Sequence, residues 1–598
     1  MVQTDVLVVG AGPIGLLCAI ILIKQGHSVY IFDKKEGPTN QSRAFFITPR
    51  SLEILQQYGV ASSILKRALC IRGAAIFVNG SSLGDISVEE ADTIFPQLTS
   101  LQQSKIEEAL VEEFEKFKGT VQWQHTLQSY QQHDDHVSAK VMNDITKEVV
   151  DIEAKYIVGA DGCHSSVRKQ DPTWTYDGAT IKTKFALADV ILTGDDVLKV
   201  KNRQTAFYHS IGGCIMIPMP MDIEDDDTKA AVRIVCNMGP YDVDTTDRRV
   251  TQGFNITKEE FTLEQLKEIM AERLQGLNIE VEKPIWLTYF GVNERMANGF
   301  RRQRAFLIGD AAHCHSPVGG QGMNIGFQDA DNLAWKLSVV LKGGSSDPEK
   351  LLESYTIERE PMVKSVLESV GSASRIAFAQ SPIFSFLRQA ALYVAFSIPM
   401  VIKAFADRFM QIDFHLGESP ILSSKNKSTL IQPGQYIRET RSLVSRDASI
   451  EISRKTIYQI LENFEGKHGI FFLLTRHSWQ KEPHKEVLEG FVQGVSKYEK
   501  TCRGLVAQSI TQYPNYFDGK TKKRAQNVDY WIDTHAISSS DSLSSRLGFT
   551  KYLMNDKTPI PPAAFIVVRP DRYVAYSQLV YSKDDLIPAF EFLNTYLC

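Results

Sequence analysis

The stretch DVLVVGAGPIGLLCAIILIK, residues 5–24, decides the fold of the first part of this 598-residue chain. An apolar run typical of a buried strand is followed at once by a G-x-G-x-x-G turn and then by an apolar segment of helical length. Gly10 permits the tight turn, Gly12 lets the backbone approach a pyrophosphate, and Gly15 allows close packing of the helix. Because a helix N-terminus attracts anions, the stretch predicts one half of a dinucleotide-binding fold.

A second predicted strand, residues 28–32, ends at Asp33, roughly 20 residues after the glycine turn. An acidic side chain at this place accepts a hydrogen bond from a ribose hydroxyl. Strand, helix, strand and acid follow in the order of a βαβ unit, so a purely structural glycine turn is the weaker alternative. The motif alone does not distinguish FAD from NAD(P).

The composition predicts a globular protein of several domains that binds a small molecule. The hydrophobic share is 43% and the charged share 23%, an ordinary mixture. A net charge of -5 offers no basic excess of the kind that binds nucleic acid. The eight cysteines form no Cys-x-x-Cys pair, and the chain starts directly with a strand-like run, so we expect a reduced, cytoplasmic protein.

One apolar run, AALYVAFSIPMVI at residues 390–402, raises the question of a membrane contact. It is shorter than the ~18 to 20 residues that span hydrocarbon, and Pro399 interrupts it. We therefore expect no transmembrane span. A pair of buried helices is favoured over a helix on a membrane surface, although weak membrane association stays open.

Three further blocks follow the first motif in a fixed order. They are SRA at 42–44 with TPRSLE at 48–53 and Gln103, then YIVGADGCHSSVR at 156–168, and finally RAFLIGDAAHCHSPVGGQGMNIG at 304–326. With these blocks the sequence resembles the single-component FAD-dependent aromatic hydroxylases, which include para-hydroxybenzoate hydroxylase and phenol 2-monooxygenase. The resemblance covers nearly the whole chain.

The resemblance implies the cofactor and its contacts. FAD would be the bound dinucleotide, and NAD(P)H would visit transiently, since no second complete glycine motif is present. The implied FAD contacts are Gly10, Gly12, Gly15, Asp33, Arg43, Gln103, Asp161, Asp310, Gly322, Met323 and Asn324. Within this set Asp310 would hold the ribityl hydroxyls, and the amides of Met323 and Asn324 would stabilise negative charge on the reduced flavin. Pro317 would lie beside the reactive edge of the ring.

The resemblance also implies an α/β and α+β architecture: a Rossmann-like FAD-binding domain, a β-sheet substrate domain and a C-terminal thioredoxin-like domain. The expected segments are 1–175 and 286–412 for the two parts of the FAD-binding domain, 176–285 for the substrate domain, 413–435 for a linker and 436–598 for the last domain. Alternating apolar residues in the second segment predict its sheet independently. Without Cys-x-x-Cys the last domain should lack dithiol chemistry, and a structural role, including contact in a homodimer, is expected.

The implied reaction is a monooxygenation. NADPH would reduce FAD, oxygen would add to the reduced ring, and the flavin hydroperoxide would transfer one oxygen atom to a phenolic or other aromatic substrate. Tyr289 is the candidate base or proton relay, although a strand tyrosine that only packs is the stronger alternative. Residues Tyr208, His209, Met216 and Arg233 are candidates for the pocket wall, each with a structural alternative.

Two local features refine this prediction. Where phenol hydroxylases place an aspartate, this chain has Phe45 or Phe46, which favours a larger or more apolar aromatic substrate than phenol. The run His313-Cys314-His315 does not predict a metal site, because adjacent residues rarely converge on one ion. His313 is expected instead to be a hydrogen-bonded residue beneath the following helix.

Two alternatives to hydroxylation remain. Baeyer-Villiger oxygenation or epoxidation could use the same flavin-binding residues. The Trp-x-Trp-x-Ile-Pro motif expected of a halogenase is absent. A non-catalytic flavin-binding protein is the second alternative, and turnover would distinguish it.

Overall fold

The computed structural model describes residues 1–39, 45–209, 212–220, 226–240, 253–254, 260–274, 276–314, 320–377, 387, 390–395, 398–445, 453–475, 485–509, 527–535, 539–555 and 558–598. The chain divides into two compact units. The first contains residues 1–23, 28–330 and 363–412, and the second contains residues 24–27, 331–362 and 413–598. This division is coarser than the five predicted segments, which stay a prediction.

The first unit contains a sheet that begins with the predicted βαβ unit: β1 (Val2–Val9), α1 (Pro13–Lys24) and β2 (Val29–Asp33). Strand β1 pairs in parallel with β2 and with β11 (Val149–Gly159), and β11 pairs in parallel with β19 (Ala305–Leu307). The remaining strands are β8 (Val121–Trp123), β9 (His125–Gln132), β10 (Val137–Asn143) and β18 (Arg301–Arg302). The parallel arrangement confirms the dinucleotide-binding architecture predicted from the first motif.

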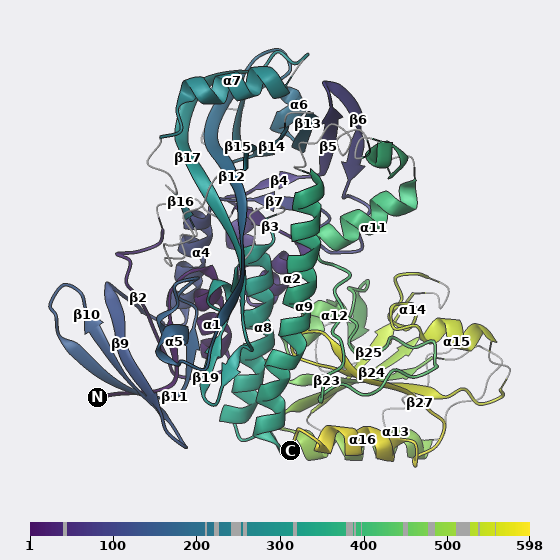
Figure 1. The fold of residues 1–598 in the computed structure, drawn as a ribbon. Helices are drawn as coiled ribbons and strands as arrows, with labels where there is room; N and C mark the ends of the chain where they lie inside the picture. Colours follow the sequence, from purple (N-terminus) through teal and green to yellow (C-terminus); the bar gives the residue numbers. More distant parts are fainter. Residues whose placement is uncertain are drawn as a thin grey trace. The chain divides into compact units, whose positions relative to one another are not determined.

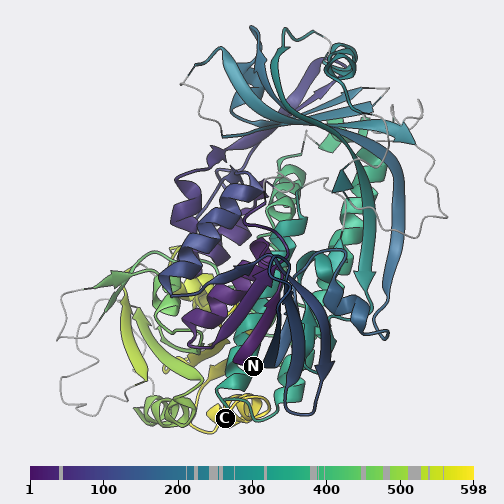
Figure 2. The same ribbon diagram turned by 90° about the vertical axis from the view of Figure 1, so that its left-hand side faces the viewer.

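A second sheet of the same unit contains the strands predicted between 176 and 285. Its order is β16-β17-β12-β15-β14-β13-β5-β6, with β20 (His313–Cys314) beside β17. The bounds are β5 (Gly73–Val78), β6 (Ser81–Ser87), β12 (Tyr176–Thr193), β13 (Gln204–His209), β14 (Gly212–Pro218), β15 (Lys229–Pro240), β16 (Gly253–Phe254) and β17 (Glu280–Ala297). Helix α7 (Leu263–Arg273) covers one face, and Figures 1 and 2 show the strands of the first sheet on the side of the other face.

A small sheet and several helices complete the part of the chain up to residue 412. A small sheet is formed by β3 (Phe46–Ile47), β7 (Leu98–Ser100) and β4 (Leu69–Ile71). The helices are α2 (Pro49–Gln57), α3 (Ala61–Leu65), α4 (Gln103–Lys116), α5 (Ser166–Gln170), α6 (Leu198–Lys201), α8 (Gly322–Leu341), α9 (Pro348–Ala377) and α11 (Pro399–Phe409). Helices α8 and α9 contribute residues to both units.

The apolar run at 390–402 is helical at 390–395 and again from Pro399. The prediction that these helices are buried is wrong for the described residues, because Tyr393 is 68% and Met400 81% exposed. One side of α11 does pack, through Ala406 and Met410, against a core that includes Phe46. No helix that the structure describes is both long and apolar enough to cross a membrane.

The second unit contains a sheet of order β22-β21-β25-β24-β23-β26-β27. Its strands are β21 (Leu443–Ser445), β22 (Arg454–Lys455), β23 (His468–Leu474), β24 (Cys502–Ser509), β25 (Val528–Asp533), β26 (Ala563–Val568) and β27 (Val574–Val580). The helices are α12 (Ile457–Glu462), α13 (Lys485–Val495), α14 (Leu543–Arg546), α15 (Phe549–Asn555) and α16 (Leu586–Asn594). Strand β23 is fully buried, and β26 and β27 pair as an antiparallel hairpin.

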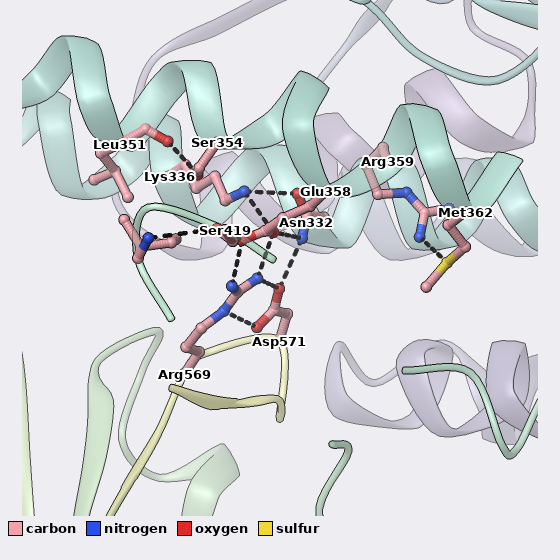
Figure 3. Close-up of polar contacts among 11 residues, drawn as sticks. Asn332, Lys336, Leu351, Ser354, Glu358, Arg359, Met362, Ser419, Arg569 and Asp571 are labelled. Carbon is pink, nitrogen blue, oxygen red and sulfur yellow. Dashed lines mark hydrogen bonds and ion pairs between the residues drawn. The ribbon is translucent and has the colours of Figure 1, made fainter. Parts of the chain in front are cut away.

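A buried ion network joins the helical part of this unit to the β26–β27 turn (Figure 3). Arg569 donates to Glu358 Oε1 and Oε2 at 2.6 and 2.9 Å, and to Asp571. Lys336 Nζ lies 2.8 Å from Glu358 Oε2. Burial lowers the pKa of Lys336 to about 8, whereas Arg569 and Lys336 outweigh burial at Glu358 and lower the pKa of that carboxyl. The network therefore keeps several charged groups buried in the unit, and loss of one group would leave a buried charge without its partner.

Candidate functional site

The three sequence motifs lie at the carboxyl ends of neighbouring parallel strands. Val9 is in register with Gly159 across β1 and β11, and Gly159 is in register with Leu307 across β11 and β19. The residues that follow these strands therefore emerge at one edge of the sheet. In open α/β sheets this edge is where nucleotide ligands bind.

The first glycine turn combines tight packing with open space. Gly10 has φ +105°, and a Cβ built on it would lie 2.5 Å from the Ala160 carbonyl oxygen. A Cβ on Gly15 would lie 2.0 Å from the Gly10 carbonyl oxygen, whereas a Cβ on Gly12 would meet no atom within 4 Å. The first and third glycines thus bring backbones together, and the second adjoins space into which a ligand fits.

Asp33 contacts this turn directly, and Gln103 is linked to Asp33 through Glu107 and Lys35. Asp33 Oδ2 accepts a hydrogen bond from the Ala11 amide at 2.8 Å. Gln103 Nε2 donates to Glu107 Oε1 at 2.9 Å, and Glu107 Oε2 accepts from Lys35 Nζ at 3.1 Å. Lys35 also lies 3.9 Å from Asp33, measured from Nζ to Oδ2. The structure therefore brings together two of the residues predicted to contact the cofactor.

Asp161 carries an unsatisfied oxygen at the edge of the sheet. Its Oδ2 accepts from the amide and the hydroxyl of Ser166, each at 2.6 Å. Its Oδ1 is buried and has no hydrogen-bond partner. A buried acceptor without a donor costs free energy, so a donor from a bound molecule fits this position.

The third motif forms a 3-10 turn, Gly309–Ala311, with Asp310 exposed. The buried carboxylate of Asp329 fixes the turn from below, because its Oδ2 accepts from the Gly309 amide at 3.0 Å and lies 2.7 Å from His313 Nε2. His313 is thus a hydrogen-bonded residue beneath α8, as predicted. Among the described residues no cluster of three His, Cys, Asp or Glu side chains could hold a metal ion.

A residue that the sequence reasoning did not assign ties the second motif to the third. Arg168 Nη1 donates to the Ala311 carbonyl at 2.5 Å, and its Nη2 donates to the Cys163 carbonyl at 2.7 Å. The guanidinium carbon also lies 3.7 Å from the centre of the Tyr176 ring, and the Tyr176 hydroxyl donates to the Asp310 carbonyl at 3.0 Å. Burial raises the pKa of Tyr176, so this hydroxyl keeps its proton and remains a donor.

The N-terminus of α8 favours the binding of a negatively charged group. The first turn of the helix carries no acidic residue. By helical geometry the amides of Gly322, Met323 and Asn324 have no intrahelical acceptor. The Asn324 side chain is itself structural, since its Oδ1 accepts from the Thr48 amide at 2.9 Å and its Nδ2 donates to the Phe46 carbonyl at 2.9 Å. These residues therefore fit the electron-rich end of a flat anionic ring.

Two predicted site residues, Arg43 and Pro317, lie outside the described residues. We call the turn at residues 10–15, Asp161, the Gly309–Ala311 turn and the first turn of α8 the cradle. Tyr289 lies away from it, on the face of the second sheet that α7 covers. Its hydroxyl donates to Gln265 Oε1 of α7 at 3.3 Å, and Lys184 Nζ lies 3.6 Å from the centre of its ring. This placement favours the packing alternative, and a catalytic role for Tyr289 stays a prediction.

The residues predicted to line the pocket lie on different faces of the second sheet. Met216 belongs to the core under α7. Arg233 lies on the other face, with Nε 2.7 Å from Asp189 Oδ1 and Nη2 2.7 Å from Asp189 Oδ2. Its guanidinium carbon lies 4.4 Å from the centre of the Phe45 ring and 5.7 Å from that of Trp286. Tyr208 and His209 lie in β13 and are partly exposed.

Arg233 is linked to the start of α8 through Phe45, which packs on its guanidinium. Phe45 directly precedes Phe46, whose carbonyl accepts from Asn324. The face of the sheet that carries Arg233, Asp189 and Trp286 is therefore the face near the cradle. Sequence reasoning missed Asp189 and Trp286, because strand alternation does not say which of two faces a residue occupies.

Comparison with known proteins identifies the same cofactor region. The family model described as FAD binding domain matches residues 3–370. A 6-methylpretetramide 4-monooxygenase of Streptomyces rimosus is 28% identical over 460 residues, which cover 76% of this chain and 77% of that protein. A rifampicin monooxygenase of Rhodococcus hoagii is 31% identical over 385 residues, 64% of this chain and 73% of that protein. An aklavinone-11 hydroxylase solved with FAD and aklavinone has the same fold, with a TM-score of 0.67, 21% identity and coverage of 100% and 99% of the two chains.

Proposed function

Because the chain belongs to the FAD-binding-domain family of aromatic flavoprotein monooxygenases, we propose that it hydroxylates a large, apolar phenolic substrate. The enzyme uses FAD as its cofactor and NAD(P)H as a transient co-substrate. When bound, the flavin is reduced by the nicotinamide and activates oxygen, which supplies the atom that enters the aromatic ring. The observation that carries the proposal is the meeting of the three motifs at one sheet edge, near the face that carries Arg233.

The residues of the cradle would hold the cofactor in defined ways. The open space at Gly12 and the N-terminus of α1 suit the pyrophosphate. Asp33 would accept from a ribose hydroxyl, and the unpartnered Asp161 Oδ1 and the exposed Asp310 carboxylate would accept from further hydroxyls of the cofactor. The first-turn amides of α8 would stabilise negative charge on the ring. Arg43, Gln103 and Pro317 remain proposed contacts from the family resemblance.

The substrate preference rests on the residues around Arg233. Phe45 packs its ring on the guanidinium, which is already bound in a bidentate ion pair by Asp189. Aromatic side chains present a flat apolar surface on which a further ring can stack. With Phe45 and Trp286 beside the cradle, a multi-ring phenol would bury more apolar area than phenol itself.

We also propose that the second unit contains a thioredoxin-like domain. What supports this is the order β24-β23-β26-β27, in which the first pair is parallel and the other two pairs are antiparallel, with α13 between the parallel strands in sequence. The chain has no Cys-x-x-Cys motif, so a structural role is proposed for this domain.

The test is turnover by the FAD-loaded enzyme across phenols of one, two, three and four rings. NADPH consumption and hydrogen peroxide are measured in the same samples, and products are identified by mass spectrometry and NMR. We expect a multi-ring phenol to accelerate NADPH consumption, with little peroxide and one added hydroxyl on an intact ring. Asp310→Ala, which should lose FAD, is the negative control, and Asp227→Ala, on an exposed turn, should behave as wild type.

Other products would redirect the proposal. An inserted oxygen that opens or expands a ring would favour a Baeyer-Villiger reaction, and an epoxide would favour epoxidation. Peroxide formed in proportion to NADPH with every compound would contradict hydroxylation of this substrate class.

A further inference from the structure

Several large apolar side chains of the first unit are exposed before and at the start of α11. We call this group the apolar face and define it as Leu387, Tyr393, Val394, Ile398, Met400 and Val401. Their exposed fractions are 56, 68, 59, 43, 81 and 43%. Other large exposed apolar side chains of this unit, such as Ile145 and Ile285, are scattered over separate elements. Because soluble monomers rarely expose many large apolar side chains within one short segment, this group indicates a binding role.

Helix α11 has one packed side and one exposed side. Ala406 and Met410, four residues apart, belong to the core around Phe46, and Ile402 packs against the same core. Met400 and Val401 lie outside that core and are exposed. The fold of the unit therefore uses one side of the helix and leaves the other available for a partner.

The charges in the sequence that contains the apolar face indicate the partner. From residue 369 to residue 406 the sequence contains Arg375, Arg388 and Lys403 but no aspartate or glutamate, although the whole chain has a net charge of -5. The Lys403 side chain is 61% exposed, and it also pairs with Asp407 Oδ2 at 3.0 Å. A segment that is apolar, locally basic and without acidic residues complements an anionic lipid surface.

We propose that the apolar face docks on an anionic membrane surface, with its aliphatic and tyrosine side chains inserted at the level of the headgroups. Such insertion removes apolar area from water, and exposed lysine can lie along the apolar surface while its ammonium group contacts lipid phosphate. Tyrosine suits the same boundary, because its ring is apolar and its hydroxyl is polar.

The apolar face is connected to the candidate site through the end of α11. The Phe409 ring lies 5.9 Å from the Phe46 ring, measured between centres, and the Phe409 carbonyl accepts from Gln321 Nε2 at 3.1 Å. Gln321 directly precedes α8, whose first turn forms part of the cradle. A docked enzyme would thus have the substrate side of its cradle near the bilayer. This step rests on the proposed function and implies an aromatic substrate that partitions into lipid.

The test is flotation of the FAD-loaded protein with vesicles, without NADPH or substrate. Vesicles of phosphatidylcholine alone are compared with vesicles that also contain phosphatidylglycerol. We expect binding to the anionic vesicles, reduction of that binding about fivefold by Lys403→Gln, and loss of binding in the double variant Met400→Glu, Val401→Glu. Ile145→Glu, which changes an apolar residue that is 67% exposed on a distant hairpin, should bind as the wild type does.

Flavin absorbance of each variant verifies that the cradle is folded. The proposal is overturned if the wild type does not bind anionic vesicles, or if the double variant binds them equally well. It is also overturned if the wild type binds no vesicles but forms a dimer that the double variant dissociates, because the face then serves a second copy. Since no turnover is measured, failure here is distinct from failure of the hydroxylase proposal.

Discussion

A single methyl group should have opposite consequences at two glycines that lie three residues apart. At Gly15 a Cβ would overlap the Gly10 carbonyl oxygen, whereas at Gly12 it would enter space that no protein atom occupies. Gly15→Ala should therefore destabilise the apoprotein by about 1–3 kcal/mol. Gly12→Ala should change its stability by no more than about 0.5 kcal/mol and weaken FAD binding at least about tenfold.

Thermal unfolding of the apoprotein and titration with FAD measure the two effects separately. Equal loss of stability in both variants would contradict the assignment of the space beside Gly12 to the cofactor. The wild-type apoprotein, prepared in the same way, is the reference.

At the residue scale, prediction from sequence depends on how local the chemistry is. Gly10, Gly15 and Asp33 belong to one continuous motif, and the structure brings them together beside the end of β1. Arg168 was not predicted as a link between motifs, because its acceptor on Ala311 lies 143 residues away along the chain. Spacing along the sequence cannot predict this contact, because it depends on the pairing of β11 with β19 in the folded protein.

At the scale of elements, the face of a strand decides what its residues can do. Tyr289 and Trp286 lie in β17, yet one packs under α7 and the other lies near Arg233. Alternation predicts opposite faces for residues three apart, as the structure shows for these two, but it does not say which face lies near the cradle. The sequence therefore predicted the sheet but not which side would cover the cradle.

Tyr289→Phe tests this assignment of faces. Because the hydroxyl contacts Gln265 and lies under α7, its removal should cost about 0.5–1.5 kcal/mol of stability and leave the rates of flavin reduction and product formation nearly unchanged. Stopped-flow absorbance and product analysis measure both rates. Product formation slowed more than flavin reduction would restore Tyr289 as a candidate base or proton relay.

The ion network of the second unit gives a prediction that depends on pH. Glu358→Gln should destabilise the protein by about 3–5 kcal/mol at pH 7, because Lys336 and Arg569 lose a buried charged partner. Folding lowers the pKa of Glu358, so its stabilisation is present above the ordinary value of 4.5 and is lost as the pH falls below it.

Denaturant unfolding at pH 7 and at pH 4 measures this difference. The wild type should lose more stability between the two pH values than the variant, which has no carboxyl to protonate at that position. A parallel decline in both proteins would assign the acid sensitivity to other groups.

At the scale of the whole molecule, the described residues proposed to contact FAD all belong to the first unit. A ligand that binds only the folded state stabilises it by mass action, by about 2.7 kcal/mol at a hundred times its dissociation constant. Removal of FAD should therefore increase hydrogen exchange in β1, β11 and β19 far more than in β23 and β26. Comparable increases in both sets of strands would show that the two units unfold as one.

The order of the strands in the nucleotide-binding sheet also matters while the protein is being synthesised. Strand β1 leaves the ribosome first, but its neighbour β11 ends only at Gly159, and β19 follows at Ala305. At about 5–20 residues per second, the nascent chain waits on the order of 15 seconds to a minute before the last strand of this edge exists. During that interval the edge is incomplete, because β1 lacks β11 until residue 159 is made and β11 then lacks β19 until residue 307 is made. Chaperone binding and a slow codon near residue 300 would therefore have their largest effect on the yield of flavin-loaded protein.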